Sequence, residues 1–153
     1  EKVDFPANSE FHIYGDGPIS EKVKTIAETK NNIFYHGSLA RKELHKTLIK
    51  YDLTLIPLKS RIYGSVPSKI FEYAKLGLPI LFFSDGEGAD LVENYKLGIS
   101  QRKIDYEELE NKIRLIVEKK IKLPDSGQIL TKSNMLFNLS IQFEKFENQV
   151  LHQ

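Results

Sequence analysis

Cysteine is absent from the 153-residue chain, which excludes disulfide bonds, thiolate metal sites and cysteine nucleophiles. This absence fits a reducing compartment. The sequence also lacks an apolar run of roughly 18 residues, the length expected of a membrane-spanning helix, and it opens on no signal-peptide pattern. Charge of one sign does not dominate, because 22 Lys and Arg stand against 21 Asp and Glu. No nucleic acid partner is therefore expected, and any phosphate site must be local.

The length suits one domain. A globular chain of this size buries on the order of two thirds of its unfolded surface, so we expect a single domain over residues 1–153. The first residue is Glu1 and not Met, which indicates a processed chain or an excised part of a longer protein.

Short apolar runs alternate along the chain with longer amphipathic stretches. The apolar runs predict strands at residues 11–14, 33–35, 53–56, 80–83 and 98–100, and the amphipathic stretches predict helices at 20–30, from 38, 67–76, 90–96 and 106–118. This alternation predicts an α/β fold, a Rossmann-like open parallel sheet with helices on both faces. In such sheets ligands bind at the carboxyl ends of the strands, so the loops that follow the strands are the ones to search.

Capping residues indicate where several helices begin and end. We expect Ser20 and Ser38 to cap the first two helices. Gly77 follows the helix at 67–76 as a typical terminator. The strand after it, at 80–83, is apolar throughout, which is typical of a strand covered on both faces.

A final helix is predicted at residues 135–153, after a break at 124–127. Its apolar stripe consists of Leu139, Phe143, Phe146 and Val150. No strand follows, so this helix either closes the domain's own core or packs on something outside this chain. Helical spacing leaves both readings open.

Residues 15–20 begin like a dinucleotide-binding fingerprint, but Ser20 occupies the position of the third glycine. An ordinary tight turn is the favoured interpretation, although Gly15 and Gly17 would let a ligand approach the backbone closely. The four histidines show no metal-ligand spacing, so no metal site is expected. His12 lies inside a strand and is interpreted as structural, whereas His36 ends a strand at the expected ligand edge.

The start of the helix at 67–76 carries the strongest candidate site. Pro67 lacks an N–H and suits a first helical turn. The remaining free N–H groups, the helix dipole and the hydroxyls of Ser65 and Ser68 would attract an anion. Lys69 adds a positive charge, and Glu72 lies one turn further on the same face, where its carboxylate could accept hydrogen bonds from ribose hydroxyls. The residues alone allow an ordinary helix with a surface Lys69–Glu72 pair equally well.

Four blocks in order resemble the C-terminal domain of GT-B glycosyltransferases, above all the family 4, group 1 enzymes of bacterial surface-polysaccharide synthesis. The blocks are residues 11–18 (FHIYGDGP), 32–37 (NIFYHG), 51–57 (YDLTLIP) and 66–81 (VPSKIFEYAKLGLPIL). The resemblance covers roughly residues 11 to 150. It implies a domain that binds a nucleoside-diphosphate sugar of the UDP or GDP type and transfers the sugar with retention, without a cofactor or metal.

The resemblance also assigns roles to residues. Glu72 matches the second glutamate of the family's Glu-x7-Glu motif, which holds the ribose. The other implied donor contacts are Gly64, Ser65, Val66, Ser68 and Lys69 at the diphosphate, His36 and Gly37 near the base, and Gly15 and Gly17 at the border of the donor cleft.

Two departures from the family accompany this match. Gly64 stands where the first motif glutamate would be, so the catalytic residue is unassigned, and the family's basic Arg and Lys near the start of the domain have no counterpart. Both departures are consistent with the chain being the C-terminal half of a longer enzyme, whose N-terminal, acceptor-binding domain is not in this chain. We therefore expect the chain alone to bind nucleotide without transferring sugar.

The resemblance further implies a cytoplasmic location, or the inner face of a membrane if the full enzyme associates with it peripherally. Two alternatives stay open: a GT-B relative such as a UDP-N-acetylglucosamine 2-epimerase, or a non-catalytic α/β phosphate-binding module. The sequence specifies neither the base, the donor sugar nor the acceptor.

Overall fold

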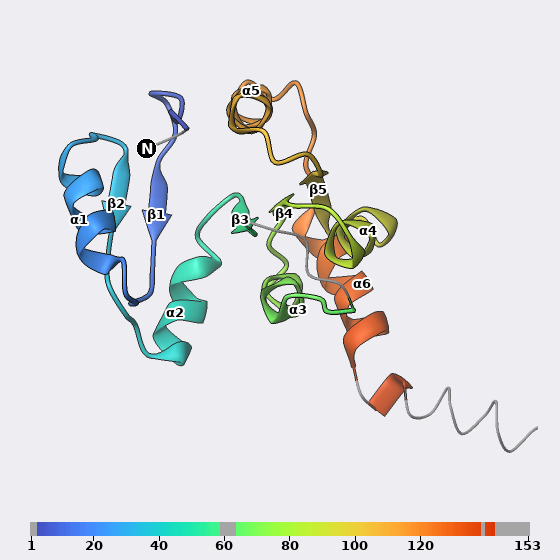
Figure 1. Cartoon of the computed structure of the whole chain (residues 1–153). Helices are drawn as coiled ribbons and strands as arrows, with labels where there is room; N and C mark the ends of the chain where they lie inside the picture. Colours follow the sequence, from blue (N-terminus) through green and yellow to red (C-terminus); the bar gives the residue numbers. More distant parts are fainter. Residues whose placement is uncertain (1–2, 59–63, 139, 143–153) are drawn as a thin grey trace, which may run out of the picture. The chain divides into compact units, whose positions relative to one another are not determined.

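The structure is a computed structural model that describes residues 3–58, 64–138 and 140–142, with the elements labelled in Figure 1. In chain order these are β1 (Phe11–Ile13), α1 (Ser20–Glu28), β2 (Ile33–Tyr35), α2 (Arg41–Leu48), β3 (Thr54–Pro57), α3 (Ser68–Lys75), β4 (Ile80–Phe83), α4 (Glu87–Asn94), β5 (Gly98–Gln101), α5 (Tyr106–Val117) and α6 (Ser126–Phe137). The chain divides into two compact units. Residues 1–50 and 105–122 form the first, and residues 51–104 and 123–153 form the second.

The first unit is built on a parallel pair of strands, β1 and β2, in which His12 pairs with Phe34. The backbone ladder continues beyond the strands, because Gly15 N–H donates to the Gly37 carbonyl over 2.8 Å. Helix α1 packs against β2, as its position beside that strand in Figure 1 illustrates. The carboxyl ends of β1 and β2 therefore bring two glycine-containing loops to one edge.

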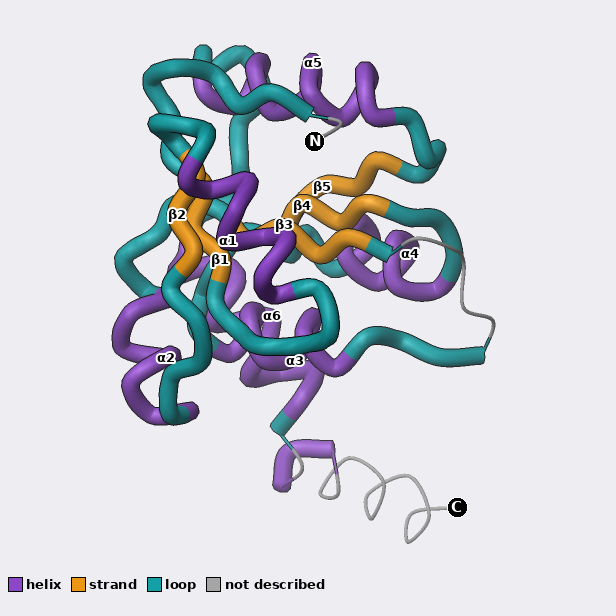
Figure 2. The backbone as a smooth tube through the Cα atoms, turned by 60° about the vertical axis from the view of Figure 1, so that its left-hand side comes forward, coloured by secondary structure: helices purple, strands orange, loops and turns teal. Residues whose placement is uncertain are grey.

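The second unit contains a three-stranded parallel sheet in the order β3-β4-β5. Its strands lie side by side in Figure 2. The central strand is apolar at every position, and no residue of Ile80–Phe83 is more than 3% exposed. A strand with a neighbour on each edge and cover on each face must be apolar throughout, as the sequence pattern predicted.

Helices supply the apolar partners of this central strand. Ile80 and Phe82 belong to one buried cluster together with Ile70 of α3, Val92 of α4 and Ile129 of α6. Helices α3 and α6 also contact each other directly. The start of α3 is thus fixed to the sheet through a packed core, and a rigid support of this kind suits a binding site.

The predicted α/β fold with parallel strands is confirmed. Every strand pair is parallel, and the five strands form a two-stranded and a three-stranded sheet. Helix α3 and its end are also as predicted. Its C-cap is Leu76, followed by Gly77 with a φ of 72°.

The predicted serine caps of the first two helices are wrong. Ser20 is the first residue of α1 and Ile19 is the N-cap, because the Ser20 hydroxyl is bound to the preceding loop through Asp16 and Gly17. Ser38 lies ahead of α2, whose N-cap is Ala40 in an extended conformation with a ψ of 141°.

Two other helices begin earlier than predicted. Helix α4 starts at Glu87 and not at residue 90, because Gly86 serves as N-cap with a φ of 96°. Helix α6 starts inside the predicted break at 124–127, where the Asp125 carboxylate accepts from the N–H groups of Gly127 and Gln128. The stripe of Leu139, Phe143, Phe146 and Val150 lies outside the described residues.

A substitution at Gly98 tests how closely the backbones of β4 and β5 approach each other. A Cβ on Gly98 would overlap the carbonyl oxygen of Ile80 and lie 2.6 Å from its carbonyl carbon. We expect Gly98→Ala to lower the free energy of unfolding by about 3 kcal/mol, since a backbone contact cannot move aside like a side chain. Urea denaturation measures this loss.

Gly17→Ala is the matched control. A Cβ there would meet nothing within 4 Å and the φ of Gly17 is not positive, so a change below about 0.5 kcal/mol is expected. Equal stability of the two variants would contradict the assigned register of β4 and β5.

Candidate functional site

The start of α3 presents backbone donors without a side-chain cap. Pro67 is the N-cap, with φ −58° and ψ 126°, and within the described part of the chain no side chain caps the first turn. The N–H groups of Ser68 and Lys69 lie ahead of any helical acceptor and point away from the helix body. The positive end of the helix dipole is added to these donors, so this end attracts an anion.

The loop leading into α3 is anchored at one residue and open at its neighbours. Val66 packs against the buried cluster of the second unit, whereas Gly64 and Ser65 are exposed. Gly64 has a φ of 68°, in the left-handed region that favours glycine. Ser65 and Ser68 are exposed at the approach to the helix, where their hydroxyls can serve a ligand.

Lys69 and Glu72 form an ion pair one turn inside the helix. The Lys69 Nζ lies 2.7 Å from the Glu72 Oε2, and the side chains are 48% and 14% exposed. The Glu72 side chain is therefore largely buried, whereas the Lys69 side chain is partly exposed to solvent. The surface pair that the sequence allowed as one interpretation is present, and it sets a cation and a carboxylate side by side next to the free N–H groups.

Tyr73 completes the surroundings of this pair. The Lys69 Nζ lies 5.7 Å from the centre of the Tyr73 ring, a cation–π distance. Burial raises the pKa of the Tyr73 phenol, with smaller opposing effects of Lys69, which lowers it, and Glu72, which raises it. The tyrosine is accordingly neutral at physiological pH and offers a ring face to the ammonium.

The loops after β1 and β2 form a second group of predicted residues, in the first unit. Gly15 has a φ of 132° and Gly37 a φ of 68°, conformations that L side chains rarely adopt. Beyond the Gly15–Gly37 backbone bond, the Tyr35 hydroxyl donates to the Gly15 carbonyl over 2.9 Å. These bonds hold the two glycine loops together at the carboxyl edge of the strands.

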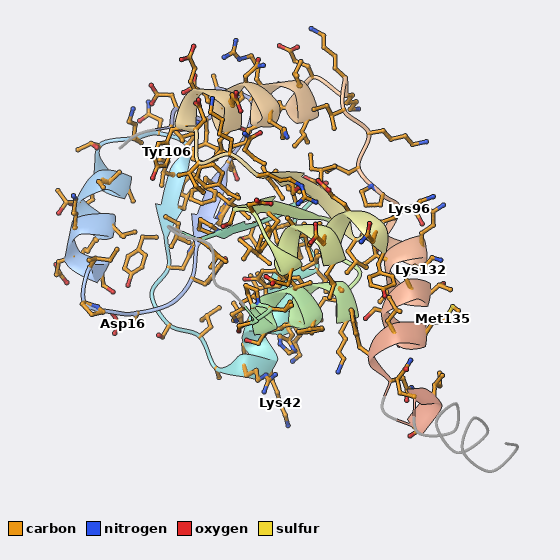
Figure 3. The ribbon with its side chains drawn as sticks, turned by 45° about the vertical axis from the view of Figure 1, so that its right-hand side comes forward. Asp16, Lys42, Lys96, Tyr106, Lys132 and Met135 are labelled. Carbon is orange, nitrogen blue, oxygen red and sulfur yellow. The ribbon has the colours of Figure 1, made fainter. Side chains whose placement is uncertain are left out.

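Hydrogen bonds also order the turn after Gly15. The Asp16 Oδ1 accepts from Gly17 N–H at 2.8 Å and from the Ser20 hydroxyl at 2.6 Å. Figure 3 labels Asp16 on this loop. The serine in place of a third glycine thus has a structural use, which agrees with the tight turn favoured from sequence.

His36 lies in a contact network that the sequence did not reveal. Its Nε2 is 2.9 Å from the Nδ1 of His12, and the Nε2 of His12 is 3.0 Å from the Glu10 Oε2. The His36 ring also stacks on the Tyr14 ring with centroids 4.5 Å apart. Parallel pairing puts alternate residues of β1 and β2 on one face, but sequence spacing does not set the register that brings His12 next to His36.

A further charged network lies at the carboxyl ends of β4 and β5. Arg102 donates to Asp85 at 2.9 Å and to Glu93 at 2.6 Å, and its Nη2 is 2.8 Å from Asp90. Glu93 also accepts from the Ser100 hydroxyl. The carboxylates, Glu93 first, raise the pKa of the Arg102 guanidinium. The Arg102 side chain, at the end of β5, thereby connects the loop after β4 with helix α4.

The predicted site residues fall into two groups, each held together within one unit. Gly15, Gly17, His36 and Gly37 belong to the first unit, and Gly64, Ser65, Val66, Ser68, Lys69 and Glu72 belong to the second. Within the described ranges, no three His, Asp or Glu side chains are arranged to hold a metal ion. None of the helices in the same ranges has the length and apolarity needed to cross a membrane.

Comparison with known proteins identifies the fold. The fold matches the solved apo form of the lipopolysaccharide outer core galactosyltransferase WaaB with a TM-score of 0.70 and 15% sequence identity, over 94% of this chain. That match spans only 40% of the WaaB chain. Among the curated proteins, none matches. The fold is that of a GT-B glycosyltransferase domain.

The family model described as "Glycosyl transferases group 1" matches residues 2–119. This range covers most of the chain and contains both groups of predicted site residues. The chain therefore belongs to the group 1 glycosyl transferases.

Asp16 provides a test of the loop between β1 and α1. Its pKa is lowered from 3.8, first by the hydrogen bond from Ser20 and then by the Gly17 N–H. The carboxylate therefore stabilises the folded loop above the unfolded pKa, and this contribution is lost as the pH falls through the folded pKa. Carboxyl ¹³C NMR should show a titration midpoint for Asp16 below 3.8.

Ser20→Ala should move that midpoint upward because it removes the strongest donor to Asp16. A matched substitution, Ser38→Ala, lies ahead of α2 and should leave it unchanged. An Asp16 midpoint at or above the ordinary value in the wild-type chain would contradict the hydrogen-bonded turn.

Proposed function

We propose that this chain is the donor-binding part of a longer, retaining glycosyltransferase. It would bind a nucleoside-diphosphate sugar of the UDP or GDP type, whose sugar is transferred to a glycan or lipid-linked acceptor. The family match supports glycosyl transfer. The observation that carries the assignment of the donor site is the start of α3, where free N–H groups, an ammonium and a carboxylate lie within one helical turn.

The diphosphate would bind at the first turn of α3. The N–H groups of Ser68 and Lys69 are oriented donors that need no rearrangement, and Lys69 supplies a full positive charge beside them. Gly64 and Ser65 leave the approach open, because both are exposed. These interactions strengthen as negative charge develops on the leaving nucleoside diphosphate, so they favour cleavage of the bond between the sugar and the phosphate.

The ribose would be held by Glu72. Helical side chains lean toward the N-terminus, so this carboxylate points to the same end of α3 as the diphosphate site. A carboxylate can accept from both vicinal hydroxyls of a ribose. Its 14% exposure limits competition from water and raises the value of those hydrogen bonds.

Within the first unit, the loops after β1 and β2 are a second candidate contact for a nucleotide. Gly15, Gly17 and Gly37 have no Cβ, so the backbone can approach a ligand closely, and His36 is exposed at the same edge. Loops at the carboxyl ends of parallel strands are where this class of fold binds nucleotides.

The remainder of the enzyme is part of the same proposal. The chain spans 40% of WaaB, so an acceptor-binding domain elsewhere in the full protein is expected to complete the reaction. The printed name of WaaB refers to the lipopolysaccharide outer core, which supports a role in surface-polysaccharide synthesis. We place the enzyme in the cytoplasm or peripherally at the inner face of the membrane.

Nucleotide titration tests the donor site. We expect the chain to bind one nucleoside diphosphate, among UDP, GDP and ADP, more tightly than inorganic phosphate. Glu72→Ala should weaken that binding about ten- to a hundredfold, the value of charge-assisted hydrogen bonds to a ribose. Isothermal titration calorimetry gives the dissociation constants.

Glu28→Ala is the control, because Glu28 is an exposed carboxylate near the end of α1. It should bind nucleotide like the wild type. A site that binds inorganic phosphate as well as any nucleotide, and that ignores Glu72→Ala, would identify a generic anion module and refute the proposal.

The isolated chain should bind donor without transferring sugar. Incubation with UDP- and GDP-sugars, alone or with lipid and glycan acceptors, should release no nucleoside diphosphate above the protein-free rate. The reason is that the proposed acceptor domain is needed to position the second substrate. Robust transfer by the 153-residue chain would show that the reaction does not need a separate acceptor-binding domain.

A further inference from the structure

Two buried polar atoms without partners lie between the end of β4 and the start of α4. Ser84 directly follows β4 and is 1% exposed. Within the described part of the chain, neither the Ser84 Oγ nor the Glu87 Oε2 has a hydrogen-bond partner. Burial of such an atom costs free energy unless another group bonds to it. Two orphaned atoms only three residues apart therefore indicate a missing partner at this turn.

Packing directs both side chains into the same turn. The first turn of α4 lies over Phe82, because a Cβ added to Gly88 would be 2.5 Å from the Phe82 Cζ. Side chains alternate along an extended chain, so Ser84 follows Phe82 on the face that α4 covers. Glu87 is the first residue of α4, and helical side chains lean toward the N-terminus. Glu87 is only partly buried, so rotation of its carboxylate can bring either oxygen to a ligand.

The backbone at the start of α4 adds hydrogen-bond donors. Gly86 is the N-cap, with a φ of 96° and a ψ of −161°, and no side chain of the described ranges caps this helix. The Asp90 N–H is bonded to the Gly86 carbonyl over 3.1 Å. The N–H groups of Glu87, Gly88 and Ala89 come ahead of any helical acceptor. Donors, a hydroxyl and a carboxylate are thus gathered at one turn.

The charges around this turn disfavour simple ions. An anion would meet the carboxylates of Glu87, Asp85 and Asp90. A metal cation would meet the positive end of the α4 dipole and the Arg102 guanidinium, which already pairs with Asp85 and Asp90. A neutral group that both donates and accepts satisfies the carboxylate and the N–H groups together, and a hydroxyl does both. The chemistry therefore favours a sugar with neighbouring hydroxyl groups.

This turn lies in the same unit as the start of α3 and at the same edge of the sheet. Strands β3 and β4 are parallel neighbours, with Pro57 paired to Phe83, so the segments that follow them leave from one edge. Val66, just ahead of α3, packs against the buried cluster that contains Phe82 and Ala89. The two helix starts are therefore supported by one core.

We propose that Ser84, Glu87 and the first turn of α4 bind the sugar of the donor, with the Glu87 carboxylate accepting from its hydroxyls and the α4 N–H groups donating to them. The Ser84 hydroxyl completes the contact as donor or acceptor. The inference rests on the proposed nucleotide site at α3 and deepens it, because it assigns the residues that recognise the sugar. Gly64, ahead of α3, has no side chain to offer for that purpose.

A nucleotide sugar compared with its own nucleoside diphosphate tests these contacts. Calorimetric titrations would use UDP-glucose, UDP-galactose, UDP-N-acetylglucosamine and GDP-mannose beside UDP and GDP. The nucleotide sugar that binds most tightly should lose about tenfold or more in affinity in Glu87→Gln, the value of a charge-assisted hydrogen bond. The matching diphosphate should change by no more than about twofold, since it does not reach Glu87.

Asp90→Asn is the matched control. It removes the same charge from the first turn of the same helix, and Asp90 is exposed and engaged by Arg102. Both affinities should stay within about twofold of the wild type. Equal losses for the nucleotide sugar and the diphosphate in Glu87→Gln, or the same loss in Asp90→Asn, would identify a general charge effect and overturn the sugar contact.

Ser84→Ala separates a ligand contact from a structural role. Its hydroxyl has no partner among the described residues, so its removal should leave the urea midpoint unchanged or raise it. The affinity for the nucleotide sugar should fall about three- to tenfold. A lower urea midpoint with unchanged affinity would show that the hydroxyl serves the fold, and Ser84 would have no place in the site.

The failures of the two proposals are distinguishable. Binding of UDP or GDP that depends on Glu72, with a nucleotide-sugar affinity unaffected by Glu87→Gln, overturns this inference and leaves the proposed function standing. Absence of binding by every nucleotide and nucleotide sugar overturns both.

Discussion

Parallel backbone pairing is the constraint on which the site depends. When neighbouring strands run in one direction, their following loops gather at a single edge, and side chains distant in sequence become neighbours. In the second unit this pairing requires Gly98 opposite Ile80, and it requires β4 to be apolar on both faces. In the first unit it places Gly15 beside Gly37 and joins His12 to His36.

Much of the fold could be predicted because its signals are local. The apolar run at 80–83 and the glycine after α3 each determine a strand or a helix end through short-range physics. The serine caps failed for the same kind of reason. Ser20 has a competing partner, Asp16, four residues earlier, and residue type alone does not show which hydrogen bond prevails.

The arrangement of the candidate residues was predictable only where they lie close together in the sequence. Pro67, Lys69 and Glu72 lie at one short stretch of a single helix, so sequence spacing by itself puts them on one side of that helix. The contact of Glu10, His12 and His36 depends on the register between two strands and on ring rotamers, neither of which sequence spacing encodes. The network of Arg102 is similarly hidden, because its partners come from the loop after β4 and from α4.

The Lys69–Glu72 pair has a consequence for selectivity. An anion that approaches Lys69 does not meet a lone cation, because it must exchange places with a carboxylate that stays nearby. A simple anion that binds the Lys69 ammonium would lie close to the displaced Glu72 carboxylate, and the two negative charges would repel each other. A ligand that combines negative charge with hydroxyl donors at the right separation would satisfy both former partners together. In the proposed site, the ion pair would therefore favour ligands that carry both negative charge and hydroxyl groups over simple anions.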